Sequence, residues 1–341
     1  MLGPLSQRIL TLLQLTRMAL VFTALADGAC EVLLRAAATA GPGHSYLETL
    51  DPLHLFTMSL ASVGLYGFGM SLNDIIDRRR DTQLAAHRPL PSGRLNIVAA
   101  HAVCVLFGLL AAWGGAAYAH ETHPTGWMSF MLVVACGLFI TFYDFAGKYL
   151  VGLGLLSLGM IRFLHAAAAA PWLPVPWHPL LLLNHVAILS TLAYHWEAKR
   201  PPLTRAHWWT VLGGLAGVNL LVLASIGWRR GDQTLRGAIH GLDFRPAMLL
   251  PLAAVLGFLL FGYIVRRLNP IARDAGQKLM LYGLLWLIIY DAAFVAGYVS
   301  WVAGGIVLAL LPIAWWSVQF LRWWSKVISL SQRPTFRRAR T

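Results

Sequence analysis

Apolar runs of about twenty residues recur along the whole chain and alternate with short polar stretches. Each run is long enough to cross a hydrocarbon core of about 30 Å as a helix. The predicted spans are 8–37, 53–76, 95–119, 126–144, 149–170, 179–196, 207–228, 246–267, 277–298 and 300–324. The last two are nearly contiguous and form either one hairpin or one broken helix. The fold class is therefore all-α, a polytopic membrane bundle of nine or ten transmembrane helices.

Composition supports a membrane protein. Of the 341 residues, 58% are hydrophobic and 12% are charged, whereas soluble domains carry about 25% charged residues. A spanning segment must satisfy its backbone polar groups internally, which favours helices, and these runs are too uniformly apolar for the alternating strands of a barrel. No linker divides the chain, so we predict one transmembrane domain over residues 1–330 and a basic cytoplasmic tail over 331–341.

The formal net charge of +13 would suggest a nucleic-acid partner in a soluble protein. In a membrane protein the positions of basic residues matter more, because they set topology. With a cytoplasmic N-terminus, the basic connections after the second, fourth, sixth and eighth spans all face the cytoplasm, and the exception is the arginine-bearing stretch 228–245. We predict a multi-pass protein of the cytoplasmic (inner) membrane, with lipids and no nucleic acid among its partners.

Charge concentrates at one point, residues 71–95, "SLNDIIDRRRDTQLAAHRPLPSGRL". Asn73, Asp77 and Asp81 are spaced i, i+4, i+8, which places them on one face of a helix. Unpaired, such groups would be costly at a membrane edge. A divalent cation removes that cost, and Mg²⁺ prefers oxygen ligands while leaving positions for water or phosphate.

Arginines in the same stretch complete this hypothesis. Arg78, Arg88 and Arg94 can bind phosphate oxygens through bidentate guanidinium contacts. Oxygen ligands and arginines together predict a metal–diphosphate site on the cytoplasmic side. The alternative is a solvated juxtamembrane loop whose charges form ion pairs.

The segment "NDIIDRRRDTQLAAHRPLPSGRL" resembles the first aspartate-rich motif of the UbiA superfamily of intramembrane prenyltransferases. Arg17 resembles the arginine of that family's first helix, and "TFYDFAGKYL" resembles the loop after its fourth helix. The resemblance extends over about residues 10–170. It implies a helical bundle around a central cavity that is open to lipid. The cavity would bind an isoprenyl diphosphate and Mg²⁺, and the protein would transfer the isoprenyl group to a lipophilic acceptor, either an aromatic compound or a lipid alcohol.

The resemblance also assigns roles to residues. Asn73, Asp77 and Asp81 would be the Mg²⁺ ligands, and Tyr143 and Lys148 would steady the diphosphate. Together these five residues form the predicted catalytic set. The wider set that we predict to bind substrate or diphosphate comprises Arg17, Arg78, Arg88, Asp144, Arg162, His195, Glu197 and Lys199.

The sequence departs from the family after the sixth span. Members of the family carry a second acidic motif there, whereas "TLAYHWEAKRPPLTRAHWW" contains one acidic residue, Glu197. Either Asp144, Lys199 and Arg200 reshape the site so that cationic groups replace one metal, or the protein no longer ionises diphosphates. The chain thus resembles a divergent bacterial branch that lacks a full second motif. The alternative function is a non-catalytic carrier or transporter of a lipophilic intermediate.

Ionisable residues also occur inside the predicted spans, where they are expensive and usually face the bundle interior. Arg162 and His165 lie in the fifth span, and we expect a cavity role for Arg162, with pairing to a buried polar group as the alternative. Asp27 and Glu31 lie one turn apart in the first span and would either line the cavity or bond to other helices. His195 is a candidate base for the acceptor's proton.

Overall fold

The computed structural model describes residues 11–41, 43–86, 88–122, 126–231, 234–242 and 244–331. Helices dominate these residues, and no strand occurs among them. Every predicted span contains a helix. The long helices are α2 (Val21–Ala40), α3 (Pro52–Ile76), α5 (Ile97–Glu121), α6 (Gly126–Phe142), α7 (Val151–Ala169), α8 (Trp177–Trp196), α9 (Arg205–Arg230), α11 (Leu249–Leu268), α12 (Ala272–Tyr298) and α14 (Leu310–Ser331).

Shorter elements join the long helices. The short α-helices are α4 (Arg78–Leu84), α10 (Leu235–Gly241) and α13 (Trp301–Leu308). Three 3₁₀ turns, η1 (Met18–Leu20), η2 (Tyr46–Glu48) and η4 (Pro246–Met248), and one π turn, η3 (Tyr143–Gly147), complete the described elements. Apart from Ser331, the predicted basic tail lies outside the described residues.

Among the described residues, eight helical segments are long and apolar enough to cross a membrane. They include every long helix except α2 and α8. Helix α2 carries three charged side chains, Asp27, Glu31 and Arg35, and α8 carries several histidines. The all-α, multi-pass membrane fold is thus confirmed, while the total of nine or ten spans stays a prediction.

The first predicted span, 8–37, is wrong as a continuous helix. Residues 11–15 are helical, but the chain turns at Thr16 and Arg17 before η1 and α2 begin. Arg17 adopts the left-handed conformation, with φ 46° and ψ 37°, which no residue inside a right-handed helix can adopt. The hydrophobicity pattern gave no sign of this break, because apolar residues continue on both sides of it.

The last two predicted spans form a hairpin. Helix α12 ends at Tyr298, and Ser300 caps the next helix by accepting a hydrogen bond from the Ala303 amide at 3.0 Å. Helix α13 then packs back on α12, since a Cβ on Gly304 would lie 2.9 Å from the Ala292 carbonyl oxygen. Small residues at such crossings let helix backbones approach closely.

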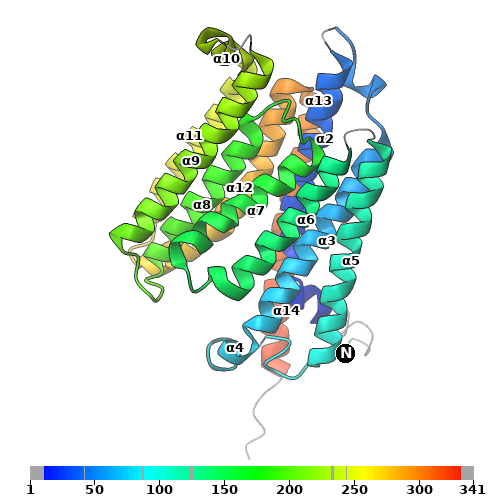
Figure 1. Cartoon of the computed structure of the whole chain (residues 1–341). Helices are drawn as coiled ribbons and strands as arrows, with labels where there is room; N and C mark the ends of the chain where they lie inside the picture. Colours follow the sequence, from blue (N-terminus) through cyan, green and yellow to red (C-terminus); the bar gives the residue numbers. More distant parts are fainter. Residues whose placement is uncertain are drawn as a thin grey trace, which may run out of the picture.

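The helices lie side by side, with α4 at one end of the bundle and α10 at the opposite end (Figure 1). At the ends of α8 and α11, the Arg266 guanidinium lies 5.9 Å from the centre of the Trp196 ring. Helix α12 begins beside them, because a Cβ on Gly276 would lie 3.0 Å from Cγ of Glu197. The connections after α8 and α11 therefore share one end of the bundle, as the predicted topology requires, while the side of the membrane they face stays a prediction.

Buried apolar clusters hold the bundle, and two of them are large. One joins α2, α3, α5, α6, α7, α8 and α9, and the other joins α2, α12, α13 and α14. Helices α3 and α5 approach each other closely, since a Cβ on Gly114 would lie 2.5 Å from the Ala61 nitrogen and one on Gly64 would lie 2.3 Å from the Ala111 nitrogen. This packing fixes the end of α3, from which the charged segment projects.

Candidate functional site

A cavity of about 300 Å³ lies inside the bundle. Most of its wall is apolar, formed by side chains such as Leu65, Ile140 and Leu158. Polar residues gather at two places on this wall. The first group is Arg17, Asn73, Tyr143 and Asp144, and the second is Ser62, Arg162 and His165.

The first group lies where the last turn of α3 meets the π turn η3. The Asn73 amide Nδ2 donates a hydrogen bond to Asp144 Oδ1 at 2.9 Å. The Lys148 ammonium lies 3.0 Å from Asp77 Oδ2 and 3.0 Å from Asp144 Oδ1. It also lies 5.9 Å from the centre of the Tyr143 ring. Four of the five residues in the predicted catalytic set thus come together, and Asp144 joins them.

The π turn explains how "YDFAG" reaches this position. A π turn contains one more residue than an α-helical turn and often occurs at functional sites. Here it widens the end of α6, so that Asp144 is buried and faces α3. Helix α7 then packs tightly against the turn, since a Cβ on Gly154 would lie 2.1 Å from the Gly147 carbonyl oxygen.

Asp81, the fifth residue of the predicted set, pairs elsewhere. Backbone bonds of 2.9 Å from Asp77 to Asn73 and from Asp81 to Asp77 preserve the predicted spacing. Helix α3 nevertheless ends at Ile76, and the Asp81 carboxylate forms an ion pair with Arg88. The side chains of Asn73 and Asp77 therefore belong to one group of contacts and that of Asp81 to a neighbouring one.

Asp74 connects this neighbouring group to the cavity through Arg17, and the spacing of the motif does not indicate a role for it. Its Oδ1 lies 3.1 Å from Arg17 Nη2 and 3.7 Å from Arg88 Nη1. The Tyr66 hydroxyl donates to the Arg17 carbonyl at 3.0 Å, which holds the left-handed residue in place. We use the name loop-end cluster for Arg17, Asn73, Asp74, Asp77, Asp81, Arg88, Asp144 and Lys148.

The remaining arginines of the motif differ in their placement. Arg94 donates to Gln14 Oε1 at 2.8 Å and to Ser92 at 3.0 Å, which ties the loop after α4 to the first segment. Burial lowers the pKa of the Arg94 guanidinium from its usual value, although an arginine stays protonated in proteins. Arg78 begins α4, is partly buried and does not line the cavity.

The donor chemistry of the loop-end cluster fits Mg²⁺. Carboxylate and amide oxygens are hard ligands, and Mg²⁺ is usually held by one or two carboxylates together with water and phosphate. Lys148 already places a positive charge between Asp77 and Asp144, and Arg88 does so between Asp74 and Asp81. Within the described chain, one group of three histidine, cysteine or acidic side chains could hold a metal ion, because its ligand atoms all lie within 4.8 Å of one another. The group consists of Cys30, His178 and Asp291. In the part of the chain that the structure describes, the loop-end carboxylates thus pair with cationic side chains and no three of them bring their oxygens within that distance.

The predicted residues after the sixth span lie outside the cavity wall. The His195 ring lies 6.3 Å from the Trp208 ring, centre to centre. Glu197 forms an ion pair of 3.4 Å with Lys199, whose ammonium lies 6.0 Å from the Tyr194 ring centre. None of His195, Glu197 and Lys199 lines the cavity, so this segment brings no second acidic group to it.

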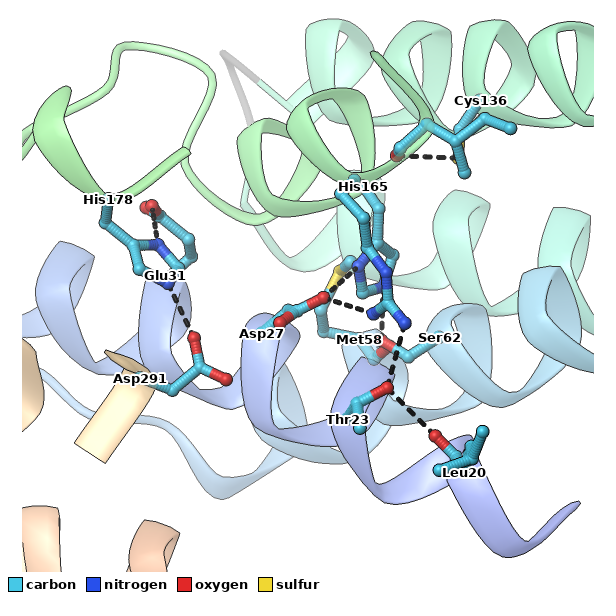
Figure 2. Close-up of polar contacts among 12 residues, drawn as sticks. Leu20, Thr23, Asp27, Glu31, Met58, Ser62, Cys136, His165, His178 and Asp291 are labelled. Carbon is cyan, nitrogen blue, oxygen red and sulfur yellow. Dashed lines mark hydrogen bonds and ion pairs between the residues drawn. The ribbon is translucent and has the colours of Figure 1, made fainter. Parts of the chain in front are cut away.

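The second polar group on the cavity wall is built around Arg162. Its guanidinium pairs with the Asp27 carboxylate and donates to Thr23 Oγ1 at 2.8 Å. His165, one turn further along α7, contacts Ser62 Oγ through Nε2 at 2.9 Å, and its Nδ1 lies 3.7 Å from Asp27 Oδ2 (Figure 2). Arg162 and His165 both line the cavity, and Arg162 is at the same time paired with a buried carboxylate, so the two interpretations of Arg162 are compatible and its role in the cavity stays a prediction.

A fully buried network continues from Asp27 into the bundle. His178 contacts Glu31 at 2.7 Å through Nδ1 and Asp291 at 2.6 Å through Nε2, with all three side chains 0% exposed (Figure 2). The sequence contains a sign of this network, because Thr23, Asp27, Glu31 and Arg35 recur every four residues and so follow one face of α2. We call Thr23, Asp27, Glu31, Arg162, His165, His178 and Asp291 the mid-membrane cluster.

Comparison with known proteins agrees with this architecture. A sequence model of the UbiA prenyltransferase family matches residues 33–200. No curated protein matches the chain. The chain is similar to the structure of a digeranylgeranylglyceryl phosphate synthase, with 15% identity and a TM-score of 0.55 over 85% of this chain and 98% of that one. At this identity the likeness extends to the fold alone.

A second similar structure is a UbiA homologue from Archaeoglobus fulgidus. In its complex with DMAPP and Mg²⁺ it shares 13% identity with the chain, covering 91% of this chain and 99% of that one at a TM-score of 0.41. In its complex with GPP and Mg²⁺ the identity is 13% and the TM-score 0.42 over the same shares of the two chains.

Proposed function

The chain belongs to the UbiA prenyltransferase family, and from this premise we propose that it transfers an isoprenyl group from a prenyl diphosphate to a lipophilic acceptor, aromatic or lipid, in a Mg²⁺-dependent reaction. One observation carries the proposal. The cavity joins an apolar wall to an end where oxygen ligands and cationic side chains meet, which are Asn73, Asp77, Asp144 and Lys148. A prenyl diphosphate has the same division between an apolar chain and a highly charged head.

The loop-end cluster supplies the groups that would hold the diphosphate. Asn73, Asp77 and Asp81 remain the proposed Mg²⁺ ligands, and bound Mg²⁺ supplies positive charge to the leaving diphosphate. Lys148 and Arg88 are partly exposed, at 14% and 31%, and each stands beside two carboxylates. With those carboxylates engaged by Mg²⁺, Lys148 and Arg88 would be free to bind phosphate oxygens, which guanidinium and ammonium groups bind well.

The rest of the cavity suits the isoprenyl chain. Leu65, Ile140 and Leu158 line it with apolar surface, and the side chains of Tyr66 and Tyr143 belong to the wall near the charged end. An aromatic face attracts positive charge, so these rings stabilise the carbon that becomes electron-poor as the diphosphate leaves. Preorganised groups of this kind contribute most when water is excluded.

The proposed setting is the cytoplasmic (inner) membrane, with the loop-end cluster on the cytoplasmic side. The support is the predicted charge asymmetry, since the stretch 78–94 that holds Arg78, Arg88 and Arg94 is the most basic connection of the chain. Basic connections stay on the cytoplasmic side of bacterial membranes.

A second candidate function is a carrier of a lipophilic intermediate that performs no chemistry. It is favoured by the segment after α8, where Glu197 pairs with Lys199 away from the cavity. Without a second acidic group, the chain would bind a prenyl compound through the loop-end cluster and the apolar wall and release it unchanged.

Diphosphate release separates the two candidates. The purified full-length protein would be incubated with Mg²⁺ and a panel of prenyl diphosphates and acceptors. Transfer predicts release that is lost on chelation of Mg²⁺ and in Asp77→Ala, whose side chain is 19% exposed and whose loss leaves Lys148 paired with Asp144. The exposed Asp274→Ala, at the start of α12, is the matched control and should retain release. Tight binding without release across the panel would support the carrier instead.

A further inference from the structure

The second polar group on the cavity wall lies deep in the bundle. Arg162 is the twelfth residue of the 19-residue helix α7. Ser62 and Asn73 both line the cavity from α3 and are eleven residues apart, which at 1.5 Å per residue separates them by about 16 Å along the helix axis. The cavity wall is therefore polar at two levels about 16 Å apart along α3, and Leu65, Tyr66 and Met70 line it between them.

The deep group has hydrogen-bonding capacity left over. A guanidinium carries five N–H donors, and among the described residues Arg162 uses them on Asp27 and Thr23 alone. The arginine side chain is 14% exposed and lines the cavity, whereas the Asp27 carboxylate behind it is 0% exposed. Unused donors in a region of low dielectric are unfavourable until an acceptor reaches them.

The hydrogen bonds of His165 define its protonation at the ring nitrogen Nε2. The Ser62 hydroxyl donates its proton to the Met58 carbonyl at 2.8 Å, so it accepts from His165 Nε2–H. His165 Nδ1 and Asp27 Oδ1 are then buried without a hydrogen-bond partner. Two independent polar atoms, both on residues more than nine-tenths buried, thus remain unsatisfied beside the Arg162 donors.

We propose that the deep group, Ser62, Arg162 and His165, is a subsite for a neutral oxygen, a hydroxyl or a carbonyl, carried by the ligand about 16 Å from its phosphate-binding end. The oxygen is neutral because Arg162 and Asp27 already balance each other in charge. An apolar chain terminus would leave the guanidinium donors unsatisfied. A site built to hydrogen-bond an oxygen rejects the analogue that lacks it. This inference rests on the proposed function and specifies its substrate as a chain with polar groups at both ends.

The oxygen can belong either to the prenyl donor or to the lipid acceptor, and paired probes distinguish the two. The first pair is farnesyl diphosphate and its ω-hydroxylated derivative with Mg²⁺. The second is a long-chain primary alcohol and the corresponding α,ω-diol in the presence of farnesyl diphosphate. We expect one hydroxylated member to bind the full-length protein about ten- to a hundred-fold more tightly than its partner, the range of one hydrogen bond to a charged group.

Variants connect that preference to the subsite. Arg162→Lys keeps the charge opposite Asp27 but loses the forked donors, and His165→Phe removes the ring nitrogens; both should reduce the preference to about two-fold or less. His185→Phe is the control, because His185 is equally buried, bonds to Gly283 and Tyr290 and does not line the cavity. It should leave the preference unchanged.

Three outcomes overturn the inference. If unmodified farnesyl diphosphate binds in an Asp77-dependent manner and neither hydroxylated probe is preferred, the subsite is wrong and the proposed function stands. A preference that persists in both Arg162→Lys and His165→Phe would likewise place the oxygen elsewhere. If no prenyl diphosphate binds at all, the proposed function fails, and the inference fails with it.

Discussion

The loop-end cluster and the mid-membrane cluster consist of the same kinds of residue but differ in how far their charged side chains are exposed. In the loop-end cluster the cationic side chains are partly exposed, up to 41% for Arg17, and Lys148 and Arg88 each stand between two carboxylates. In the mid-membrane cluster Asp27, Glu31 and Asp291 are 0% exposed. A charged side chain at the membrane edge can exchange one ion-pair partner for another, because water replaces the lost contact. A charged side chain in the interior cannot. The loop-end cluster is therefore suited to binding and releasing a charged ligand. The mid-membrane cluster instead holds the helices together and presents a few hydrogen-bond donors to the cavity.

The largest expected effect breaks the interior pair. Arg162→Met leaves the Asp27 charge buried without its partner, so the free energy of unfolding should fall by about 3–5 kcal/mol. The double variant Asp27→Asn, Arg162→Met should regain most of this loss, because it removes both charges. Denaturant unfolding in detergent micelles measures each variant.

Arg35→Met provides the control for that experiment. Arg35 donates to the neutral Tyr118 hydroxyl at 2.9 Å and has no carboxylate partner among the described residues, so its loss should cost about 1.5 kcal/mol. Equal losses in the two single variants would contradict the distinction between the clusters, since no uncompensated charge would then be involved.

An intermediate effect is expected in the loop-end cluster. Asp144→Asn keeps the side-chain shape but removes the charge beside Lys148 and Asn73. Diphosphate release should fall about a hundred-fold, the scale for removing one electrostatic group from a catalytic site. Unfolding should change little, because Lys148 retains Asp77. Steady-state release and denaturant unfolding, measured on the same preparation, test both parts, and a stability loss as large as that of Arg162→Met would refute the proposed exchange of partners.

The smallest effect is expected after α8. Glu197→Gln removes an ion pair with Lys199, whose side chain is 47% exposed, away from the cavity. Exposed pairs contribute about 0–1 kcal/mol, so diphosphate release should stay within about two-fold of the unmodified protein. A loss comparable to that of Asp144→Asn would show that this segment reaches the reacting groups and would restore a second acidic site.

Much of the fold could be predicted from the sequence, because a membrane requires long apolar helices wherever the chain crosses it. The helix positions and the closeness of Asn73, Asp77, Tyr143 and Lys148 follow from that requirement and from the motif. The break at Arg17 could not be predicted, since a left-handed residue is selected by its tertiary contacts, here Tyr66 and Asp74.

Pairing was harder to predict than position. Asp74 lies within the motif but off the stripe of Asn73, Asp77 and Asp81, and its partner Arg17 is 57 residues away. Likewise, the four-residue spacing along α2 is visible in the sequence, but Arg162, which binds Asp27 across 135 residues, can be assigned only when the helices are packed. The periodicity of a sequence shows which residues share one face of a helix, but it does not show which neighbouring helix that face packs against.

The π turn Tyr143–Gly147 sets the angular positions of the charged side chains at the end of α6. Each residue of a helix advances the chain by about 100°, so deleting one residue from the turn would rotate Asp144 and Lys148 relative to each other, and Gly154 would no longer meet Gly147. A single extra peptide unit thus keeps the charged groups of the turn in register with α3 and the turn itself in contact with the start of α7, and single-residue insertions or deletions here should be far less tolerated than substitutions.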